Sequence, residues 1–447
     1  MKSYVPNTVK EREEMLKTLG LNSMDELFAD IPDDLKLHRE LDLPKPMSEI
    51  ELRELMAAYV FENDDGGILF RGAGAYNHYI PALVPQLVSR SEFYTGYTPY
   101  QAEMSQGMLQ SIFEYQTVIC NLTGMEASNA SVYDGATAAA ESLHMLRDCK
   151  HKSKILYSAA LHPDVITVMK TYAHCMKAEL VEIGITENGT TDIEKLKENL
   201  PNSAGFIAAQ PNYYGCIENM DELAEAVHAA KALFVSFVNP ISLGEIKRPA
   251  DYGADIAIGD VQPMGVPLNF GGPYAGFMAT SGKLIRHLPG RIVGETHDDE
   301  GGRAYVLTLQ AREQHIRRQH ASSNICSNQM LTAIASSIYA CTMGPAGMKE
   351  VAQQNIAKAH YLASELAKLP GIKLRYNTPF FNEFVTDSEC PAEDINDELK
   401  ELGITGGLVL PDGGMLWCAT EMNTKDEIDF LIDSLNDFLN ANPKEEQ

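Results

Sequence analysis

The amino-acid sequence predicts an α/β protein whose central sheet is mostly parallel. Between residues 61 and 325, short apolar runs alternate with segments of helical periodicity, an alternation typical of βαβ units. The runs interpreted as strands are KILYSAALHPDV, KAELVEIGI, AGFIAAQPNYYG, ALFVSFVNPISLG and ADIAIGDVQP. Helical patterns such as TDIEKLKENL and MDELAEAVHAAK separate them, so successive strands are expected to run in the same direction.

Three stretches are expected along the chain of 447 residues. Residues 1–60 form an N-terminal helical extension with capping-box patterns at Ser23 and Ser48, each followed three residues later by glutamate. Residues 61–325 form a large α/β domain. Residues 326–447 form a smaller α+β domain that opens with a long helical segment. The extension is expected to wrap either the body of the protein or a partner.

Composition excludes several classes of partner. A formal net charge of −26 repels phosphate backbones and anionic lipids, so neither nucleic acid nor a membrane is expected. The sequence has no long apolar run and no apolar leader, which predicts a cytoplasmic protein. Eight scattered cysteines form no Cys-x-x-Cys pair, so neither a metal site nor a disulfide framework is expected.

A first candidate site lies in VYDGATAAAESLHML. Asp134, Gly135 and Thr137 stand at the start of a predicted helix of small residues. Free N–H groups and the helix dipole make such an end a site for anions, including phosphate. The alternative is a plain N-cap by Asp134 with small residues that allow close packing, and spacing alone favours this alternative.

A second candidate is the aromatic segment that precedes the next predicted helix. Thr98 is expected to cap that helix, with Pro99 at its first position and Gln101 completing a capping box. Tyr94 and Tyr97 flank a glycine just before it. Two aromatic rings on a short loop can stack on a planar ligand or anchor a partner. The alternative is a pair of tyrosines buried beneath the helix.

A third candidate is the basic segment LQAREQHIRRQHASSN, residues 309–324. It holds the only dense basic cluster of an acidic chain, including Arg312 and His315. Arginine is suited to bidentate capture of a carboxylate. The alternative is a solvated helix face paired with Glu313, which is the usual role of such runs.

Two strand ends carry amides where cofactor chemistry would need charge. The strand LFVSFV is followed by Asn239, and the strand ADIAIGD is followed by Gln262. In pyridoxal phosphate enzymes of fold type I, a carboxylate at the first position contacts the pyridine nitrogen, and a lysine at the second forms a Schiff base. Asparagine cannot act as that anion, and glutamine cannot form a Schiff base. The chain therefore has this architecture without its covalent chemistry, or else an unrelated α/β sheet.

Six motifs resemble one family over essentially the whole chain, the glycine dehydrogenases (decarboxylating), which are the P-proteins of the glycine cleavage system. The likeness is to the α subunits of the two-subunit members. The motifs are RGAGAYNHYIPALV (71–84), FYTGYTPYQAEMSQG (93–107), NASVYDGATAAAES (129–142), QPNYYGCIE (210–218), GDVQPMGVPLNFGGPYAGFMA (259–279) and REQHIRRQHASSNICSNQ (312–329).

This resemblance implies a large domain of fold type I, a small C-terminal domain and an N-terminal extension. It implies an oxidoreductase that is active only with a related β subunit, which carries pyridoxal phosphate, in an α2β2 assembly. When the two subunits are aligned on Gly-Gly-Pro, the lysine position of the β subunit falls on Gln262. The complete enzyme decarboxylates glycine and passes the aminomethyl group to the lipoyl arm of H-protein.

The resemblance also implies roles for the candidate residues. No catalytic residue or covalently bound cofactor is expected in this chain. The degenerate phosphate loop is expected to hold no cofactor, and the other candidates are expected to position substrate or line the lipoyl path at the partner's active site. The loop comprises Asp134, Gly135 and Thr137, and the positioning residues are Tyr94, Thr95, Tyr97 and Gln101, followed by Arg312 and His315. A stand-alone pyridoxal phosphate decarboxylase or aminotransferase and a purely structural, inactive paralogue remain as alternatives.

Overall fold

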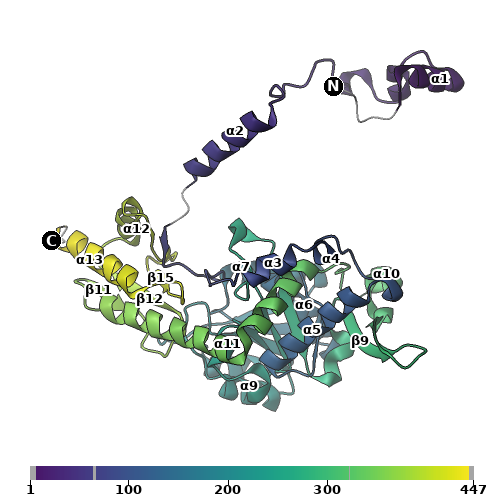
Figure 1. Ribbon diagram of the computed structural model, residues 1–447. Coiled ribbons are helices and arrows are strands. Elements are labelled where there is room, and N and C mark those ends of the chain that lie inside the picture. Colours follow the sequence, from purple (N-terminus) through teal and green to yellow (C-terminus); the bar gives the residue numbers. More distant parts are fainter. Residues whose placement is uncertain (1–6, 64–66, 322, 442–447) are drawn as a thin grey trace. The chain divides into compact units, whose positions relative to one another are not determined.

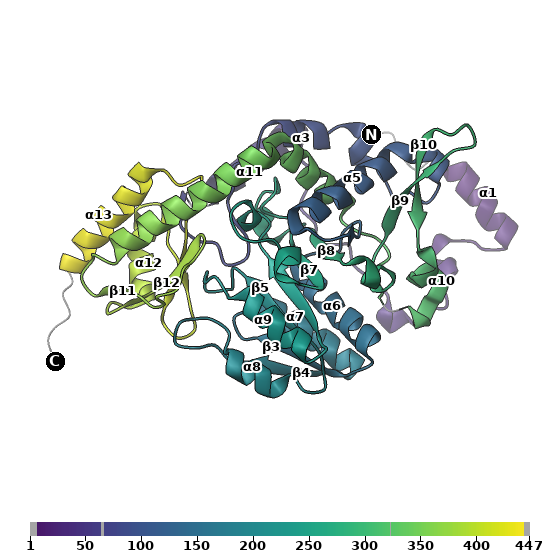
Figure 2. The same ribbon diagram turned by 90° about the horizontal axis from the view of Figure 1, so that it is seen from below.

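The computed structural model describes residues 7–63, 67–321 and 323–441. The chain separates into two compact units, Met1–Asp65 and Gly66–Gln447, which are described one at a time. Figures 1 and 2 show the larger unit from two directions.

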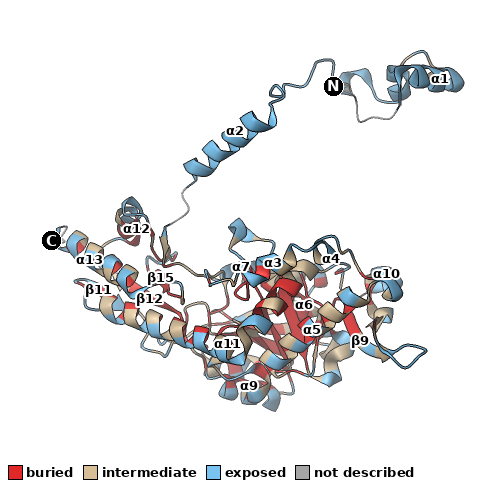
Figure 3. Ribbon diagram, viewed as in Figure 1, coloured by how far each residue is buried: buried red, intermediate tan, exposed pale blue. Residues whose placement is uncertain are grey.

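The first unit contains two helices, α1 (Val9–Leu19) and α2 (Glu49–Glu62). The capping box predicted at Ser48 is confirmed, and Thr8 forms a second one with Glu11. The capping box predicted at Ser23 is wrong, because the Glu26 carboxylate accepts from the N–H of Asn22 and only a 3-10 helix forms there. No described residue of this unit is buried within it (Figure 3).

The predicted α/β class is confirmed by the sheet of the second unit. Its described strands are ordered β2-β8-β7-β6-β5-β3-β4. The neighbours from β7 to β4 are all parallel, whereas β8 is antiparallel to both β7 and β2. The strands are β2 (Ala127–Ser128), β3 (Lys154–Ser158), β4 (Glu179–Ile183), β5 (Ser203–Gln210), β6 (Leu233–Val238), β7 (Ile256–Asp260) and β8 (Gly276–Thr280).

Helices cover both faces of this sheet, so successive residues of its central strands enter different cores. Ile207 and Ile258 pack with α6 and α7, whereas Phe206 and Ala257 pack with α5, α9 and α11. Burial on both faces explains why these strands are continuous apolar runs in the sequence. The helices are α5 (Gln106–Thr123), α6 (Gly135–Lys150), α7 (Pro163–Met176), α8 (Ile193–Asn199), α9 (Met220–Ala229) and α11 (Met330–Leu366).

The C-terminal residues form a second, antiparallel sheet with the order β11-β12-β15-β14 in the described chain. Trp417 of β15 is 1% exposed and packs with the end of α11, α12 and α13. The short strand β1 (Ile68–Leu69) pairs in parallel with β13 (Ile404–Thr405). The other elements are β11 (Ile372–Leu374), β12 (Glu383–Ser388), α12 (Ala392–Glu401), β14 (Leu408–Val409), β15 (Met415–Cys418) and α13 (Lys425–Ala441).

Helix α11 connects the two sheets, as both views show (Figures 1 and 2). It is interrupted at Gly344, whose backbone lies at φ 60° and ψ 179°. Pro345 follows, and its fixed φ suits the first position of the helix that resumes there. Helix α11 is therefore two helices joined at one residue. The domain boundary predicted at residue 325 remains a prediction.

The segment of residues 71–79, called the 71–79 segment below, is bonded to Glu383 of β12 and to Glu421. Glu383 accepts hydrogen bonds from the Ala73 N–H at 2.6 Å and from the Tyr76 hydroxyl at 2.8 Å. The Nδ1 atom of His78 lies 2.8 Å from a carboxylate oxygen of Glu421. Burial raises the pKa of Glu383 to about 7, since a buried carboxylate favours its neutral form.

We expect Gly344→Ala to lower the free energy of unfolding by about 1 to 3 kcal/mol, the cost of a non-glycine residue in this backbone region. A Cβ there would meet nothing within 4 Å, so the cost is conformational and not steric. Gly107→Ala is the matched control, because it adds a Cβ into open space within α5. Chemical denaturation of both variants measures the difference, and equal stabilities would contradict the backbone argument.

A second prediction concerns pH. Because the pKa of Glu383 is raised in the folded chain, its stabilising proton is lost as pH rises toward 7 and above. Glu383→Gln mimics the protonated group at every pH. Relative to the unsubstituted chain, we therefore expect its free energy of unfolding to be about 1 to 3 kcal/mol higher at pH 8 than at pH 5. Unfolding temperatures at both pH values measure this, with exposed Glu401→Gln as the control. An equal effect of Glu383→Gln at pH 5 and pH 8 would refute the prediction.

Candidate functional site

The carboxyl ends of the parallel strands meet at one edge of the large sheet, where ligands bind in open α/β folds. Each strand is followed there by a polar side chain: His162 after β3, Asn212 after β5, Asn239 after β6 and Gln262 after β7. Sequence analysis singled out Asn239 and Gln262. It did not single out His162, although the motif LHPDV places a histidine at the strand end just before a helix-starting proline.

Gln262 is 1% exposed, and its side chain is bound to the backbone of the 71–79 segment. Its Oε1 accepts from the N–H of Tyr76 at 2.8 Å, and its Nε2 donates to the carbonyl of Tyr76 at 2.8 Å. Nε2 also donates to the carbonyl of Val266 at 2.9 Å. Both N–H groups of the amide are thus used, so the Gln262 side chain is a structural tie to Tyr76.

Asn239 and His162 are also bonded to backbone groups. Asn239 Oδ1 accepts from the N–H of Ile241 at 3.0 Å, which caps the turn after β6. His162 Nε2 lies 2.9 Å from the carbonyl oxygen of Ala73. Its ring packs edge-on against that of Tyr213, with 5.0 Å between the ring centroids. The 71–79 segment therefore contacts His162 after β3 and Gln262 after β7, as well as Glu383 and Glu421.

Two carboxylates occupy the N-terminus of α6, which is the predicted phosphate loop. Asp134 Oδ1 accepts from the N–H of Thr137 at 2.7 Å. Asp260, at the end of β7, accepts from the N–H of Gly135 at 2.9 Å and from the N–H of Gln262 at 2.8 Å. Burial raises the pKa of Asp260 to about 7. A Cβ at Gly135 would lie 2.9 Å from the ring of Phe237, so this turn is closely packed.

These residues do not fit pyridoxal phosphate. At the helix start, the N–H groups of Gly135 and Thr137 already bond Asp260 and Asp134, so these two groups are not free to bind a phosphate. Gln262 supplies no amine, and Asn239 supplies no negative charge. Asp260 was missed from the sequence, although an acidic residue inside an apolar strand end was a signal.

The aromatic segment is exposed and differs from its predicted form. The expected helix start at Thr98 is wrong. Helix α5 begins at Gln106, whose amide bonds the backbone of Tyr305 at 2.8 and 2.9 Å and so fixes the helix start. Tyr94 and Tyr97 are 69% and 80% exposed, which rules out the alternative of tyrosines buried under the helix. Thr95 and Gln101 are exposed as well.

An apolar groove of about 350 Å³ lies beside this segment. It is formed by α3 (Leu83–Val88), the following short helix α4 (Ser91–Tyr94), α5 and the first half of α11. Its lining includes Leu83, Leu87, Phe93, Ile334, Ile338 and Cys341. The groove and the exposed tyrosines together leave apolar surface open on this side of the larger unit.

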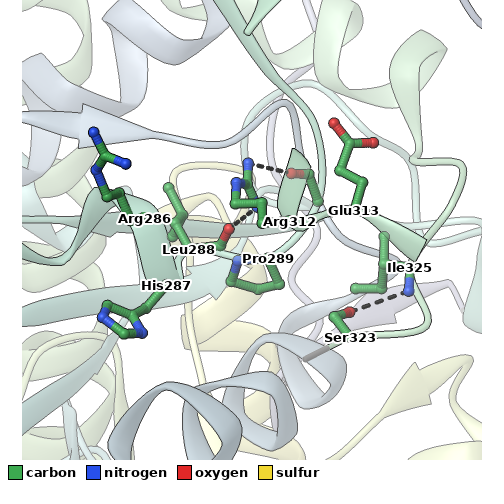
Figure 4. Close-up of a pocket in the computed structure, with 9 residues that line it drawn as sticks. Arg286, His287, Leu288, Pro289, Arg312, Glu313, Ser323 and Ile325 are labelled. Carbon is green, nitrogen blue, oxygen red and sulfur yellow. Dashed lines mark hydrogen bonds between the residues drawn. The ribbon is translucent and has the colours of Figure 1, made fainter. Parts of the chain in front are cut away.

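The basic segment forms short turns and not one helix, with α10 spanning only Gln314–Arg317. Arg312 donates to the carbonyl of Leu288 and, at 2.7 Å, to that of Gly290 (Figure 4). The pocket around these residues has a volume of about 20 Å³, enough for one water molecule. His315 Nδ1 lies 3.6 Å from the carboxylate of Glu313.

The structure brings the second and third candidate segments together through Tyr100. The Tyr100 ring lies 6.3 Å from that of His315, and its hydroxyl lies 3.8 Å from Cys326 Sγ. The same hydroxyl accepts from Arg291 at 2.9 Å. Arg291 precedes β9 (Ile292–His297), which pairs with β10 (Arg303–Thr308). Sequence analysis missed both Tyr100 and Arg291.

Within residues 7–63, 67–321 and 323–441, no three His, Cys, Asp or Glu side chains are grouped to hold a metal ion. In the same part of the chain, each helix is too short or too polar to cross a bilayer.

Comparison with known proteins identifies the family. The model of the glycine cleavage system P-protein family matches residues 2–435. A relative from Moorella thermoacetica, a probable glycine dehydrogenase (decarboxylating) subunit 1, is 47% identical over 98% of this chain and 100% of its own length. A relative from Desulfitobacterium hafniense with the same description is 46% identical over 98% of this chain and 100% of its own.

Solved structures agree with this match. The crystal structure of a glycine decarboxylase (P-protein) of the glycine cleavage system, in inhibitor-bound form, superposes with a TM-score of 0.89. It is 39% identical and covers 98% of this chain and 100% of its own. The fold is that of the fold-type-I pyridoxal phosphate enzymes, as predicted. The chain belongs to the glycine cleavage system P-protein family.

Proposed function

We propose that this chain is the subunit of a two-subunit glycine dehydrogenase (decarboxylating) that carries no cofactor. A related second subunit would hold pyridoxal phosphate, and the complex would decarboxylate glycine and transfer the aminomethyl group to the lipoyl arm of H-protein. The relatives described as subunit 1 support a two-subunit enzyme. An α2β2 assembly in the cytoplasm is part of the proposal.

The observation that carries this proposal is the occupation of the α6 N-terminus by Asp134 and Asp260. A phosphate site in such a fold needs free N–H groups at a helix start. Here those groups bond carboxylates of the chain itself. The chain therefore keeps the frame of a pyridoxal phosphate enzyme, and the cofactor has to be held by another polypeptide.

The contribution of this chain would be to complete the partner's active site across the interface. Exposed tyrosines beside an apolar groove are typical of a protein-binding surface. Tyr94, Thr95, Tyr97 and Gln101 would then reach the partner's site and orient glycine or the lipoyl arm, as positioning groups. No nucleophile of this chain is required.

Arg312 and His315 would act near the same surface. Arg312 donates hydrogen bonds to the carbonyls of Leu288 and Gly290. It would therefore position the turn at residues 288–290 without contacting substrate directly. His315 is exposed and contacts Tyr100, which places it where it could line the path of the lipoyl arm.

Restoring the lysine alone should not restore cofactor binding. We expect Gln262→Lys to remain uncoloured with pyridoxal phosphate, with no pyridoxyl group fixed by borohydride, because Asp134 and Asp260 still fill the phosphate site. Gln262→Lys also loses the bonds to Tyr76, which should lower the free energy of unfolding by about 2 to 4 kcal/mol. The control Gln262→Met loses the same bonds and should be destabilised by a similar amount. Absorbance and intact mass measure the outcome. A borohydride-stable pyridoxyl group on the lysine variant would contradict the proposed block.

The interface role predicts a defect that appears only in the complex. With the second subunit present, we expect Tyr97→Phe to slow glycine–bicarbonate exchange roughly tenfold, the effect of losing one positioned hydrogen bond. Assembly should be unchanged. Phe430→Ala is the control, since Phe430 is an exposed aromatic residue on α13 of the small domain. Unchanged exchange in Tyr97→Phe and in Arg312→Ala would reject a contributing role, and reduced assembly alone would favour a purely structural subunit.

A further inference from the structure

Four side chains form a connected set of contacts, called the Tyr100 cluster below: Tyr100, Arg291, Glu313 and His315. Arg291 Nη2 donates to the Tyr100 hydroxyl at 2.9 Å, and its guanidinium carbon lies 5.0 Å from the Tyr100 ring centroid. The Tyr100 ring also lies 6.3 Å from that of His315. The last contact of the cluster joins His315 to Glu313, whose carboxylate lies 3.6 Å from His315 Nδ1.

Arg291 is the buried member and carries more hydrogen-bonding capacity than the fold uses. It is 2% exposed, and its Nε and Nη1 atoms have no hydrogen-bond partner among the described residues. Leaving donors of a buried charged group unpaired is costly. The guanidinium donates its side-chain hydrogen bond to Tyr100, which belongs to the exposed aromatic segment. This bond points to a role of Arg291 in holding that segment.

Glu313 is the buried carboxyl group of the Tyr100 cluster. Glu313 is 6% exposed. Burial raises the pKa of its carboxyl group, and the cations of Arg291 and Arg312 oppose that shift. The Tyr100 cluster thus joins the aromatic segment, the start of β9 and the basic segment.

Tyr100 is the residue of the aromatic segment that belongs to the Tyr100 cluster, through its hydrogen bond from Arg291. The side chain of Tyr100 forms hydrogen bonds with residues distant in sequence, to Arg291 and to Cys326 Sγ. The side chain of Thr95 bonds locally, to the carbonyl of Ser91 at 2.7 Å. Tyr97 projects into solvent, so its place depends on the backbone that Tyr100 fixes.

We propose that Arg291 is a positioning residue: through Tyr100 it holds the segment of residues 94–105 in the conformation in which Tyr97 and Gln101 face the partner. The consequence for catalysis rests on the proposed function, whereas the effect on the segment's conformation does not. The guanidinium matters for its geometry as well as its charge, because lysine cannot both donate to the hydroxyl and lie as a plane against the ring.

The test uses the full chain and two conservative variants, Arg291→Lys and Tyr100→Phe, with their double variant. Hydrogen exchange of the amides in residues 94–105 should speed up about tenfold in each single variant. It should not speed up further in the double variant, because both changes remove one interaction. Arg286→Lys is the matched control, an exposed arginine close by in sequence, and should leave the exchange unchanged.

The same variants are then assayed in the assembled complex. We expect kcat for glycine–bicarbonate exchange to fall about tenfold while the KM for glycine and the amount of complex stay the same. Unchanged hydrogen exchange of residues 94–105 in both single variants would overturn the proposal. Faster hydrogen exchange with an unchanged kcat would support Arg291 as the positioning residue and count instead against the proposed catalytic role of the segment.

Discussion

The bonds from Asp134 and Asp260 to the first N–H groups of α6 are the constraint on which the rest of the site depends. A helix start at the carboxyl edge of a parallel sheet is an anion site whatever anion fills it. In this chain the anion is built in, as the carboxylate that ends β7. Gln262 then follows two residues later and bonds the peptide of Tyr76, so the end of β7 is bonded both to the start of α6 and to the 71–79 segment.

Under the proposed function, the contribution of this chain lies at its surface and not at the strand ends. At the sheet edge, Gln262 and His162 are bonded to the backbone of the 71–79 segment, whereas the aromatic segment keeps Tyr94 and Tyr97 exposed. An exposed aromatic pair is costly in an isolated soluble chain and useful at an interface. Arg291 is buried and bonds Tyr100 of the aromatic segment, so it is placed to fix the conformation in which this surface is presented.

Much of this fold could be predicted from the sequence because burial leaves a clear pattern. The continuous apolar strands and the helices between them predicted the parallel sheet, and the amides at residues 239 and 262 were visible at two strand ends. The antiparallel direction of β8 and the start of α5 were not predictable, since they depend on pairing with β2 and on the bond from Gln106 to Tyr305. Arg291 was missed because a single arginine before a strand gives no local signal of burial.

The most direct test of the central claim is where the cofactor is attached in the working enzyme. The complex of this chain with its second subunit is treated with borohydride, and the intact mass of each chain is then measured. The account predicts one pyridoxyl group on the second subunit and an unchanged mass for this chain. A pyridoxyl group on this chain, with glycine decarboxylated by this chain alone, would contradict it.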